Sequence, residues 1–204
     1  MFILVGLGNP GKEYENTRHN TGAMALEVFR KSQNFPEWKF DKKLSALTSN
    51  GKLKTYNVKL LQPQTFMNKS GDALKNLPLT THNLQQGKKK IKEIANLAVL
   101  HDDLDIPFGS YKISFNKSSG GHRGVESIIK AVKTQAFARV RIGIAASAAV
   151  VKKSQDDETV EKVILGKFTP DQLAELKKML KHIAEGLYCL ITESREKAMS
   201  QYHA

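Results

Sequence analysis

The side chains best suited to chemistry lie in one polar segment behind the first apolar stretch, where residues 6–22 read GLGNPGKEYENTRHNTG. This segment contains His19, a possible base near neutral pH, and amides such as that of Asn9, which can bind a carbonyl group. Taken singly, each of these residues is better explained as part of an ordinary connecting loop. Their density at the C-terminal end of a predicted strand favours a ligand site, because open α/β sheets bind ligands at that edge.

The start of this segment also matches the dinucleotide-binding pattern G-x-G-x-x-G. That pattern requires a helix that opens inside the glycine run and an acidic residue about 20 positions further on. After Gly11 the chain is polar and lacks helical periodicity, which begins only at Ala23. Where the acidic residue should stand, the sequence LEVFRKSQNFP is typical of a helix end followed by a loop. We therefore predict that the protein binds no dinucleotide.

A second cluster of ionisable groups, HDDLD at residues 101–105, follows the apolar sequence LAVL. Three carboxylates suggest a divalent cation. In a continuing strand, however, Asp103 and Asp105 would share one face and Asp102 the other, and no further carboxylate cluster completes a metal shell. We prefer a role in which one aspartate orients a histidine base. A metal-dependent hydrolase is the alternative, and it predicts inhibition by chelators.

Two further segments combine loop residues with predicted helix starts. The first is residues 62–71, QPQTFMNKSG, which contain Phe66, Met67 and Asn68 at a predicted helix start. Phe66 and Met67 can be core residues, and Asn68 can be an N-cap. Residues 116–124, NKSSGGHRG, form a flexible loop that runs into a helix. Backbone amides at such a position can bind a phosphate or another oxyanion. Because basic residues surround this second segment, we expect a polyanion there.

Strand-length apolar runs alternate with helix-length periodic segments, an order typical of α/β proteins. We predict a single domain over residues 1–204, with a central mixed, largely parallel twisted sheet flanked by helices. The predicted helices begin near Thr21, near Asn68, at His122 and after Thr169, where Thr-Pro-Asp-Gln provides an N-cap, a proline at the first helical position and glutamine at N3. The predicted strands cover residues 2–7, 44–48, 58–62, 97–101, 111–115 and 140–145.

Two polar stretches are predicted to be surface insertions. Residues 82–92 contain four lysines, and residues 148–158 form another charge-rich break in the apolar pattern. The lysine cluster either contacts phosphate groups or belongs to a solvated loop, which is the commoner meaning of such a run.

The charge balance points to a polyanionic partner. The chain has 32 lysine and arginine residues against 20 acidic ones, a formal net charge of +12, and such a surplus attracts nucleic acid.

The single cysteine, Cys189, excludes an internal disulfide and indicates a reducing compartment. The N-terminal sequence lacks the basic start of a signal peptide, and no apolar run approaches the ~20 residues of a membrane span. We predict a cytoplasmic protein with no membrane association.

The four polar segments described above, taken in their order along the chain, resemble the motifs of the bacterial-type peptidyl-tRNA hydrolase family. Further likeness at RVRIGI and VILGKF extends the resemblance over nearly the whole chain. The family pattern GxGNPGxxYxxTRHNxG is similar to residues 6–22, TFMNxSG to 65–71, HDDLDxPxG to 101–109 and GGHxG to 120–124.

The resemblance implies hydrolysis of the ester that joins a peptide to the 3′ end of tRNA, by a monomer that uses no metal or other cofactor. It implies that His19 is the general base, that Asp102 keeps this imidazole basic, and that Asn9 recognises the blocked amino group or peptide backbone of the substrate. Asn68 would bind the substrate backbone and help to position water. The other residues implied in binding the substrate, including the acceptor stem and 3′ end of tRNA, are Tyr14, Phe66, Met67, His122, Arg123 and Arg141.

Two positions depart from the family pattern. Arg123 stands where the family usually has asparagine, so that a cation able to bind a tRNA phosphate replaces an amide. Ser114 stands where the family has a lysine. Together with the basic surface, Arg123 motivates a second hypothesis, a catalytically silent RNA-binding relative of the same fold. The presence of both His19 and Asp102 argues against it, and an ordinary histidine pKa near 6.5 would leave most of His19 neutral at cytoplasmic pH.

Overall fold

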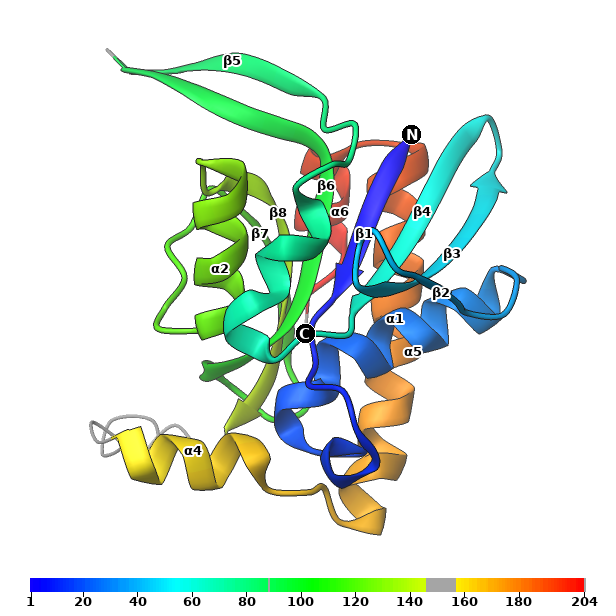
Figure 1. The fold of residues 1–204 in the computed structure, drawn as a ribbon, viewed down its shortest axis with the longest axis vertical. Coiled ribbons are helices and arrows are strands. Elements are labelled where there is room, and N and C mark those ends of the chain that lie inside the picture. Colours follow the sequence, from blue (N-terminus) through cyan, green and yellow to red (C-terminus); the bar gives the residue numbers. More distant parts are fainter. Residues whose placement is uncertain (88, 146–156, 204) are drawn as a thin grey trace.

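The computed structural model describes residues 1–87, 89–145 and 157–203, which form an α/β fold around one mixed sheet (Figure 1). Its strand order is β2-β3-β4-β1-β6-β8-β7, and β5 pairs with β6 outside this path. The strands are β1 (Phe2–Gly6), β2 (Lys39–Asp41), β3 (Ala46–Leu53), β4 (Tyr56–Pro63), β5 (Thr81–Gln86), β6 (Lys89–Pro107), β7 (Tyr111–Phe115) and β8 (Ala136–Ala145), and the helices are η1 (Lys12–Tyr14), η2 (Arg18–Asn20), α1 (Thr21–Ser32), η3 (Met67–Leu74), α2 (Arg123–Val132), α4 (Asp157–Leu165), α5 (Pro170–Thr192) and α6 (Arg195–Gln201).

The four central strands β4, β1, β6 and β8 are parallel, and the outer pairings are antiparallel. Within this centre, β1 lies between β4 and β6, with Val5 opposite Leu61 and Gly6 opposite Leu100. The carboxyl ends of these strands therefore meet at one edge of the sheet, and the polar segments that follow them begin side by side. The predicted α/β fold with a mixed sheet is confirmed.

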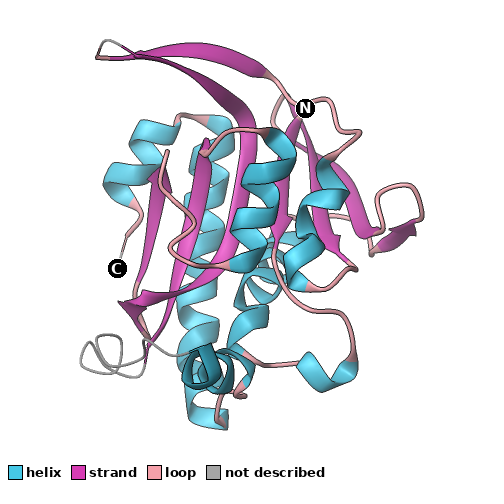
Figure 2. Ribbon diagram, turned by 60° about the vertical axis from the view of Figure 1, so that its left-hand side comes forward, coloured by secondary structure: helices cyan, strands magenta, loops and turns pink. Residues whose placement is uncertain are grey.

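Helices cover both faces of the sheet (Figure 2). Successive side chains of β1 alternate between two cores: Leu4 packs in a cluster with residues of α1 and α5, whereas Val5 packs in a second cluster with residues of η3 and α2. This alternation is the period of a strand buried on both faces. Among the described helices, none combines the length and apolar character needed to cross a membrane.

The predicted elements agree with the observed ones in type, and differ mainly at their ends. All six predicted strands are present, although the run predicted at 97–101 belongs to a much longer strand, β6. The helix at Thr169 begins with the complete capping box that its sequence indicates. Near Asn68 the helix is a 3₁₀ helix with Phe66 at the N-cap, so the N-cap interpretation of Asn68 is wrong. The sequence analysis missed β2, β5, α4 and α6 as separate elements.

The insertion predicted at residues 82–92 is part of a β-hairpin and not an irregular loop. Thr81 pairs with Ile94 and Gln86 with Lys89 across the two arms. Gly87 adopts a positive φ of 59° at the turn, a conformation that glycine reaches without steric cost. The apolar residues that support the pairing, Leu84 and Ile91, lie opposite each other. Polar neighbours on either side concealed this alternation in the sequence. Most of the other predicted insertion, 148–158, lies outside the described residues.

Gly22 allows the helix pair η2–α1 to approach the ends of β1 and β6. A Cβ atom at this position would lie 2.2 Å from the backbone oxygen of Leu100 and 2.9 Å from the backbone nitrogen of Leu7. Because both contacts are to backbone atoms of the sheet, side-chain rearrangement cannot relieve them. Glycine at this position therefore sets the distance between residue 19, three positions earlier, and the end of β6.

Replacing Gly22 with alanine is expected to lower the free energy of unfolding by at least about 1–3 kcal/mol, the usual cost of overpacking a filled interior. Chemical denaturation measures this change as a lower transition midpoint at constant slope. Gly87→Ala serves as the comparison, because it has open space around its Cβ position and only the strain of a positive φ. A midpoint equal to that of the wild type in Gly22→Ala would contradict this account of the packing.

Candidate active site

A cleft of about 510 Å³ opens at the carboxyl edge of the sheet. Its walls come from the segments after β1, β4 and β7, from the end of β6, and from α4. Nine of the ten predicted site residues line this cleft, and Arg141 is the exception. The nine are Asn9, Tyr14, His19, Phe66, Met67, Asn68, Asp102, His122 and Arg123.

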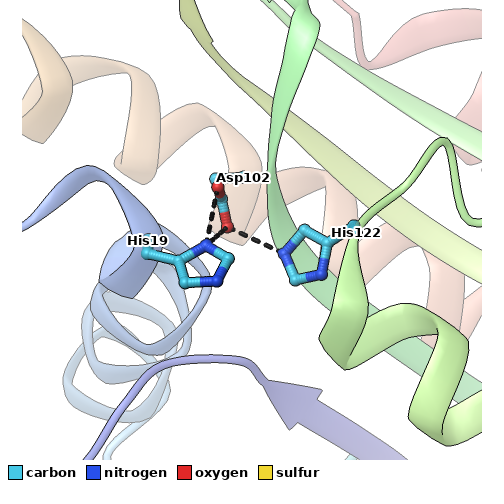
Figure 3. Close-up of side chains that lie close together, drawn as sticks. All are labelled: His19, Asp102 and His122. Atoms are coloured by element: carbon cyan, nitrogen blue, oxygen red, sulfur yellow. Dashed lines mark hydrogen bonds and ion pairs between the residues drawn. The ribbon is translucent and has the colours of Figure 1, made fainter. Parts of the chain in front are cut away.

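His19 and Asp102 form a buried pair at the floor of the cleft (Figure 3). Nδ1 of His19 lies 3.0 Å from each carboxylate oxygen of Asp102, and the two residues are only 7% and 2% exposed. A carboxylate accepts hydrogen bonds, so Nδ1 carries the proton of the neutral ring. Nε2 of His19 is then left with a lone pair, and it can accept a proton from a molecule in the cleft.

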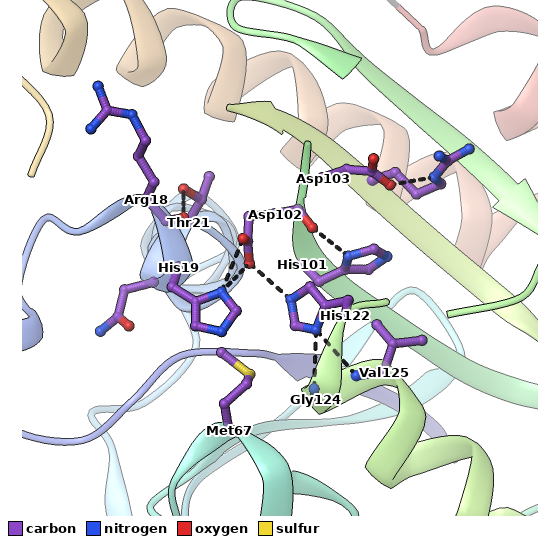
Figure 4. Close-up of polar contacts among 12 residues, drawn as sticks. Arg18, His19, Thr21, Met67, His101, Asp102, Asp103, His122, Gly124 and Val125 are labelled. Carbon is purple, nitrogen blue, oxygen red and sulfur yellow. Dashed lines mark hydrogen bonds and ion pairs between the residues drawn. The ribbon is translucent and has the colours of Figure 1, made fainter. Parts of the chain in front are cut away.

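His122 is a second partner of Asp102, which the sequence analysis did not foresee. Its Nε2 lies 2.9 Å from Oδ1 of Asp102, and its ring centroid lies 4.9 Å from that of His19. His122 is also the N-cap of α2, where Nδ1 accepts hydrogen bonds from the backbone N–H groups of Gly124 and Val125 (Figure 4). Because Nδ1 accepts, Nε2 must carry the proton that it donates to Asp102. The predicted helix start at His122 was the available signal for this contact. A histidine that caps a helix with Nδ1 has its Nε2 pointing away from the helix, free to bind another group.

The surroundings of the pair shift the pKa of both groups. For His19, burial alone lowers the pKa, but the charge and hydrogen bond of Asp102 outweigh burial and raise it above the ordinary value, while the nearby charge of Arg123 opposes this rise. For Asp102, burial alone raises the pKa, but the two imidazoles that surround the carboxylate hold it far below the usual range. Asp102 is therefore ionised at neutral pH, and the expectation of an ordinary pKa for His19 was wrong.

His101 supports this arrangement from behind the site. Its Nδ1 donates to the backbone oxygen of Asp102 at 2.6 Å, and its ring packs edge-on against His122 with centroids 4.9 Å apart. Burial, followed by the neighbouring His122 and Arg139, holds the pKa of His101 well below the ordinary value. An uncharged, buried imidazole at this position fixes both the backbone at Asp102 and the ring plane of His122.

Three hydrogen bonds hold Asn9 in place, two at its backbone and one at its side-chain amide. Its backbone N–H donates to Oδ1 of Asn20 at 2.9 Å, and Nδ2 of Asn20 donates back to the backbone oxygen of Asn9 at 3.0 Å. The side-chain oxygen of Asn9 accepts the backbone N–H of Met67 at 2.9 Å. The side-chain nitrogen of Asn9 is therefore the group that remains to donate into the cleft. The sequence analysis gave Asn20 no role.

The three aspartates of the 101–105 cluster do not converge on one point. Asp102 contacts the two histidines, whereas Asp103 forms an ion pair with Nε of Arg141 at 2.6 Å, and Asp105 is exposed. A metal site made from these three carboxylates is thus not supported by their arrangement. Donor atoms of His19, Asp102 and His122 lie within 4.8 Å of one another, but hydrogen bonds among these groups already account for that spacing.

Helix α4 closes one side of the cleft with the apolar residues Val160, Val163 and Ile164. The segment behind this helix is tied to the loop that contains His19. The backbone N–H of Arg18 donates to the oxygen of Gly166 at 3.0 Å, and the guanidinium of Arg18 lies 5.1 Å from the ring centroid of Phe168. Arg18, the residue next to His19, therefore links the loop that contains His19 to the segment that follows α4.

An α/β fold whose cleft contains a histidine held by a buried carboxylate, beside amides in a fixed orientation, is an arrangement that suits a hydrolase. Sequence comparison specifies this class further, because residues 3–204 match the profile of the family described as Peptidyl-tRNA hydrolase. The chain belongs to the peptidyl-tRNA hydrolase family, which confirms the resemblance found in its motifs.

Full-length relatives and solved structures agree with this assignment. The chain is similar to the peptidyl-tRNA hydrolase of Thermodesulfovibrio yellowstonii, with 34% identity over 100% of the chain and 99% of the relative. It is 36% identical to that of Dehalococcoides mccartyi, with both chains covered completely. The crystal structure of peptidyl-tRNA hydrolase from Acinetobacter baumannii superposes with a TM-score of 0.81 at 26% identity, covering 100% of this chain and 95% of that one.

Proposed function

We propose that this chain hydrolyses the ester between a peptide and the 3′ end of tRNA, with His19 as the general base. The observation that carries the proposal is the tautomer of His19: Asp102 binds Nδ1 and leaves the lone pair of Nε2 facing the cleft. Family membership supplies the substrate class. The release of tRNA from unfinished peptides would belong to translation, and we place it in the cytoplasm.

The reaction begins when Nε2 of His19 accepts a proton from a water molecule as the water oxygen attacks the ester carbonyl carbon. The imidazolium that forms is stabilised by the ionised Asp102. When the tetrahedral intermediate collapses, the ribose oxygen leaves and takes the proton from Nε2. The products are a peptide with a free carboxyl group and a tRNA with a free terminal hydroxyl. Because an aminoacyl ester is already reactive, one positioned base and a few amide donors suffice.

Asn9 is proposed to distinguish peptidyl-tRNA from aminoacyl-tRNA. The fixed orientation of its amide leaves an N–H donor, which suits the carbonyl oxygen of the substrate's last peptide bond. An unblocked aminoacyl group lacks that carbonyl. It has a charged ammonium instead, which has no lone pair to accept a hydrogen bond from the N–H group of Asn9. The discrimination would therefore come from one hydrogen bond that only the correct substrate can make.

The remaining walls of the cleft are proposed to bind the rest of the substrate. The side chain of Phe66 is 60% exposed, so it offers an apolar surface to the peptide or the terminal base. Tyr14 and Asn68 also line the cleft. Arg123 is proposed to contact a phosphate near the 3′ end. Arg141, oriented by Asp103 at the margin of the site, is proposed to contact the acceptor stem. We further propose that the chain acts as a monomeric single domain.

The test compares wild type with Asn9→Asp and Asn9→Ala on purified peptidyl-tRNA and unblocked aminoacyl-tRNA. Wild type should hydrolyse the blocked substrate and largely spare the unblocked one. Asn9→Asp keeps an oxygen for the N–H of Met67 but removes the donor, so kcat/KM on peptidyl-tRNA should fall about 10–100-fold, or ~1.4–2.8 kcal/mol of transition-state binding. Absence of turnover by the wild type would favour the silent RNA-binding relative. Equal wild-type rates on both substrates would refute the role of Asn9.

A further inference from the structure

The hairpin formed by β5 and the first part of β6 is a basic projection with no part in the cleft. Figure 1 shows it extending beyond the rest of the sheet, at the end opposite α4. Residues 81–92 include four lysines and no acidic residue. Lys89, Lys90 and Lys92 are exposed, and none of the three forms an ion pair with another described residue. A surface of this kind attracts phosphate groups.

A second copy of the chain fits this hairpin poorly. The outer edge of β5 pairs with no other strand in the described part of the chain, and an open edge can in principle pair with another edge. Lysines on an edge are a common means of preventing such pairing, because two copies would bring like charges together. The charge of the hairpin therefore favours a polyanion over self-association.

Strand β6 also connects the base of the hairpin to the active site. Strand β6 runs from the hairpin to the catalytic carboxylate, and at about 3.3 Å per residue Lys92 and Asp102 lie roughly 30 Å apart. This span is close to one helical turn of a nucleic-acid duplex, about 34 Å in DNA. A duplex that begins near the cleft can thus present its backbone to the hairpin one turn away.

Helix α2 provides a second connection along the same direction. Its N-terminus is capped by His122 in the active site, and its C-cap is Lys133, which is exposed. At that end, Oγ1 of Thr134 donates to the backbone oxygen of Lys92 at 2.6 Å and fixes the base of the hairpin. A shallow groove between η3 and α2 lies along this helix and is lined by Arg123 and by Lys75 and Lys130, which form ion pairs with Asp72 and Glu126 of the same groove. Basic residues therefore stand at both ends of α2, Arg123 beside the cleft and Lys133 beside the base of the hairpin.

We propose that the hairpin of residues 81–92 binds the phosphate backbone of the double-helical part of the tRNA, about one helical turn from the ester. This inference rests on the proposed function, because it takes the 3′ end of the RNA to lie in the cleft. The contact is to phosphates and carries no base specificity, which suits an enzyme that must accept many tRNAs. The hairpin thereby adds affinity for the RNA and leaves the chemical step to the cleft.

The test uses a variant with Lys89→Gln, Lys90→Gln and Lys92→Gln. Its control removes three exposed lysines from α5 on the opposite face of the sheet, as Lys177→Gln, Lys178→Gln and Lys181→Gln. Two substrates are compared: complete peptidyl-tRNA, and an N-blocked aminoacyl ester of a short single-stranded oligonucleotide ending in CCA. Affinity for uncharged tRNA is measured separately by fluorescence anisotropy over a range of salt concentrations.

On peptidyl-tRNA, the hairpin variant should show a KM raised about tenfold with kcat unchanged, and on the short substrate it should equal wild type. Its binding to uncharged tRNA should lose about one unit of salt slope per phosphate contact removed, up to about three. The same affinity and slope as wild type, or an equal loss in the α5 control, would overturn the proposal. Failure of the wild type to hydrolyse either substrate would refute the proposed function, while the anisotropy measurement would still decide whether the hairpin binds RNA.

Discussion

His19→Ala is expected to lower kcat on peptidyl-tRNA by about 10²–10⁴-fold, the range in which a general base contributes. The substitution removes the only nitrogen that Asp102 orients toward the cleft and leaves the Asp102–His122 contact in place. KM should change little, because the walls that bind substrate are not touched. The measurement is single-turnover hydrolysis of a purified peptidyl-tRNA, which separates chemistry from product release.

Two controls separate loss of the base from loss of the fold. His203→Ala removes an exposed histidine and should leave turnover at the wild-type level. Added imidazole should restore part of the activity of His19→Ala, because the truncated side chain leaves space beside Asp102 for a free base. Undiminished hydrolysis by His19→Ala would refute the assignment of His19 as the base.

The sequence predicted those parts of the fold that depend on local patterns. Strands such as 111–115 are apolar runs between turn residues, and the helix at Thr169 begins with a capping box whose atoms all lie within four residues. The convergence of the site was also predictable, because the segments after parallel strands must meet at one edge. Asn9 and His19 lie on the segment after β1, Asp102 lies in the last part of β6, and the cleft brings the three together.

What the sequence did not predict depends on contacts between distant residues. The hairpin at 82–92 forms because Leu84 meets Ile91, and two apolar residues among lysines and amides give too weak a periodic signal. The raised pKa of His19 is the outcome of opposing effects from Asp102, Arg123 and burial. None of these effects can be weighed until the distances between the groups are known.

The contact between His122 and Asp102 has the same origin. It requires α2 to begin beside the end of β6, and a motif read along the chain does not report that distance. The contact limits which side chains can replace Asp102, because the carboxylate must accept hydrogen bonds from two imidazoles. Only an ionised carboxylate has enough lone pairs and no proton to offer in return.

Asp102→Asn is therefore expected to be nearly as damaging as His19→Ala, although it changes a single atom. His122 must donate through Nε2, since its Nδ1 accepts two backbone N–H groups. The asparagine oxygen will then face His122, and its NH₂ group will face Nδ1 of His19. To accept that hydrogen bond, His19 must move its proton to Nε2, which removes the lone pair that acts as the base. We expect kcat to fall about 10²–10⁴-fold.

The pH dependence of the same variant identifies the cause. In wild type the pKa of His19 is raised, so kcat/KM should fall on the acid side with a midpoint above the ordinary value of about 6.5, as protonation removes the base. In Asp102→Asn the carboxylate charge is lost while burial and Arg123 continue to lower the pKa of His19, so the acid limb should move to lower pH. Asp171→Asn, a change of the same kind at an exposed position of α5 that does not line the cleft, should leave both rate and midpoint unchanged. An acid limb that stays in place in Asp102→Asn would mean that Asp102 does not set the basicity of His19.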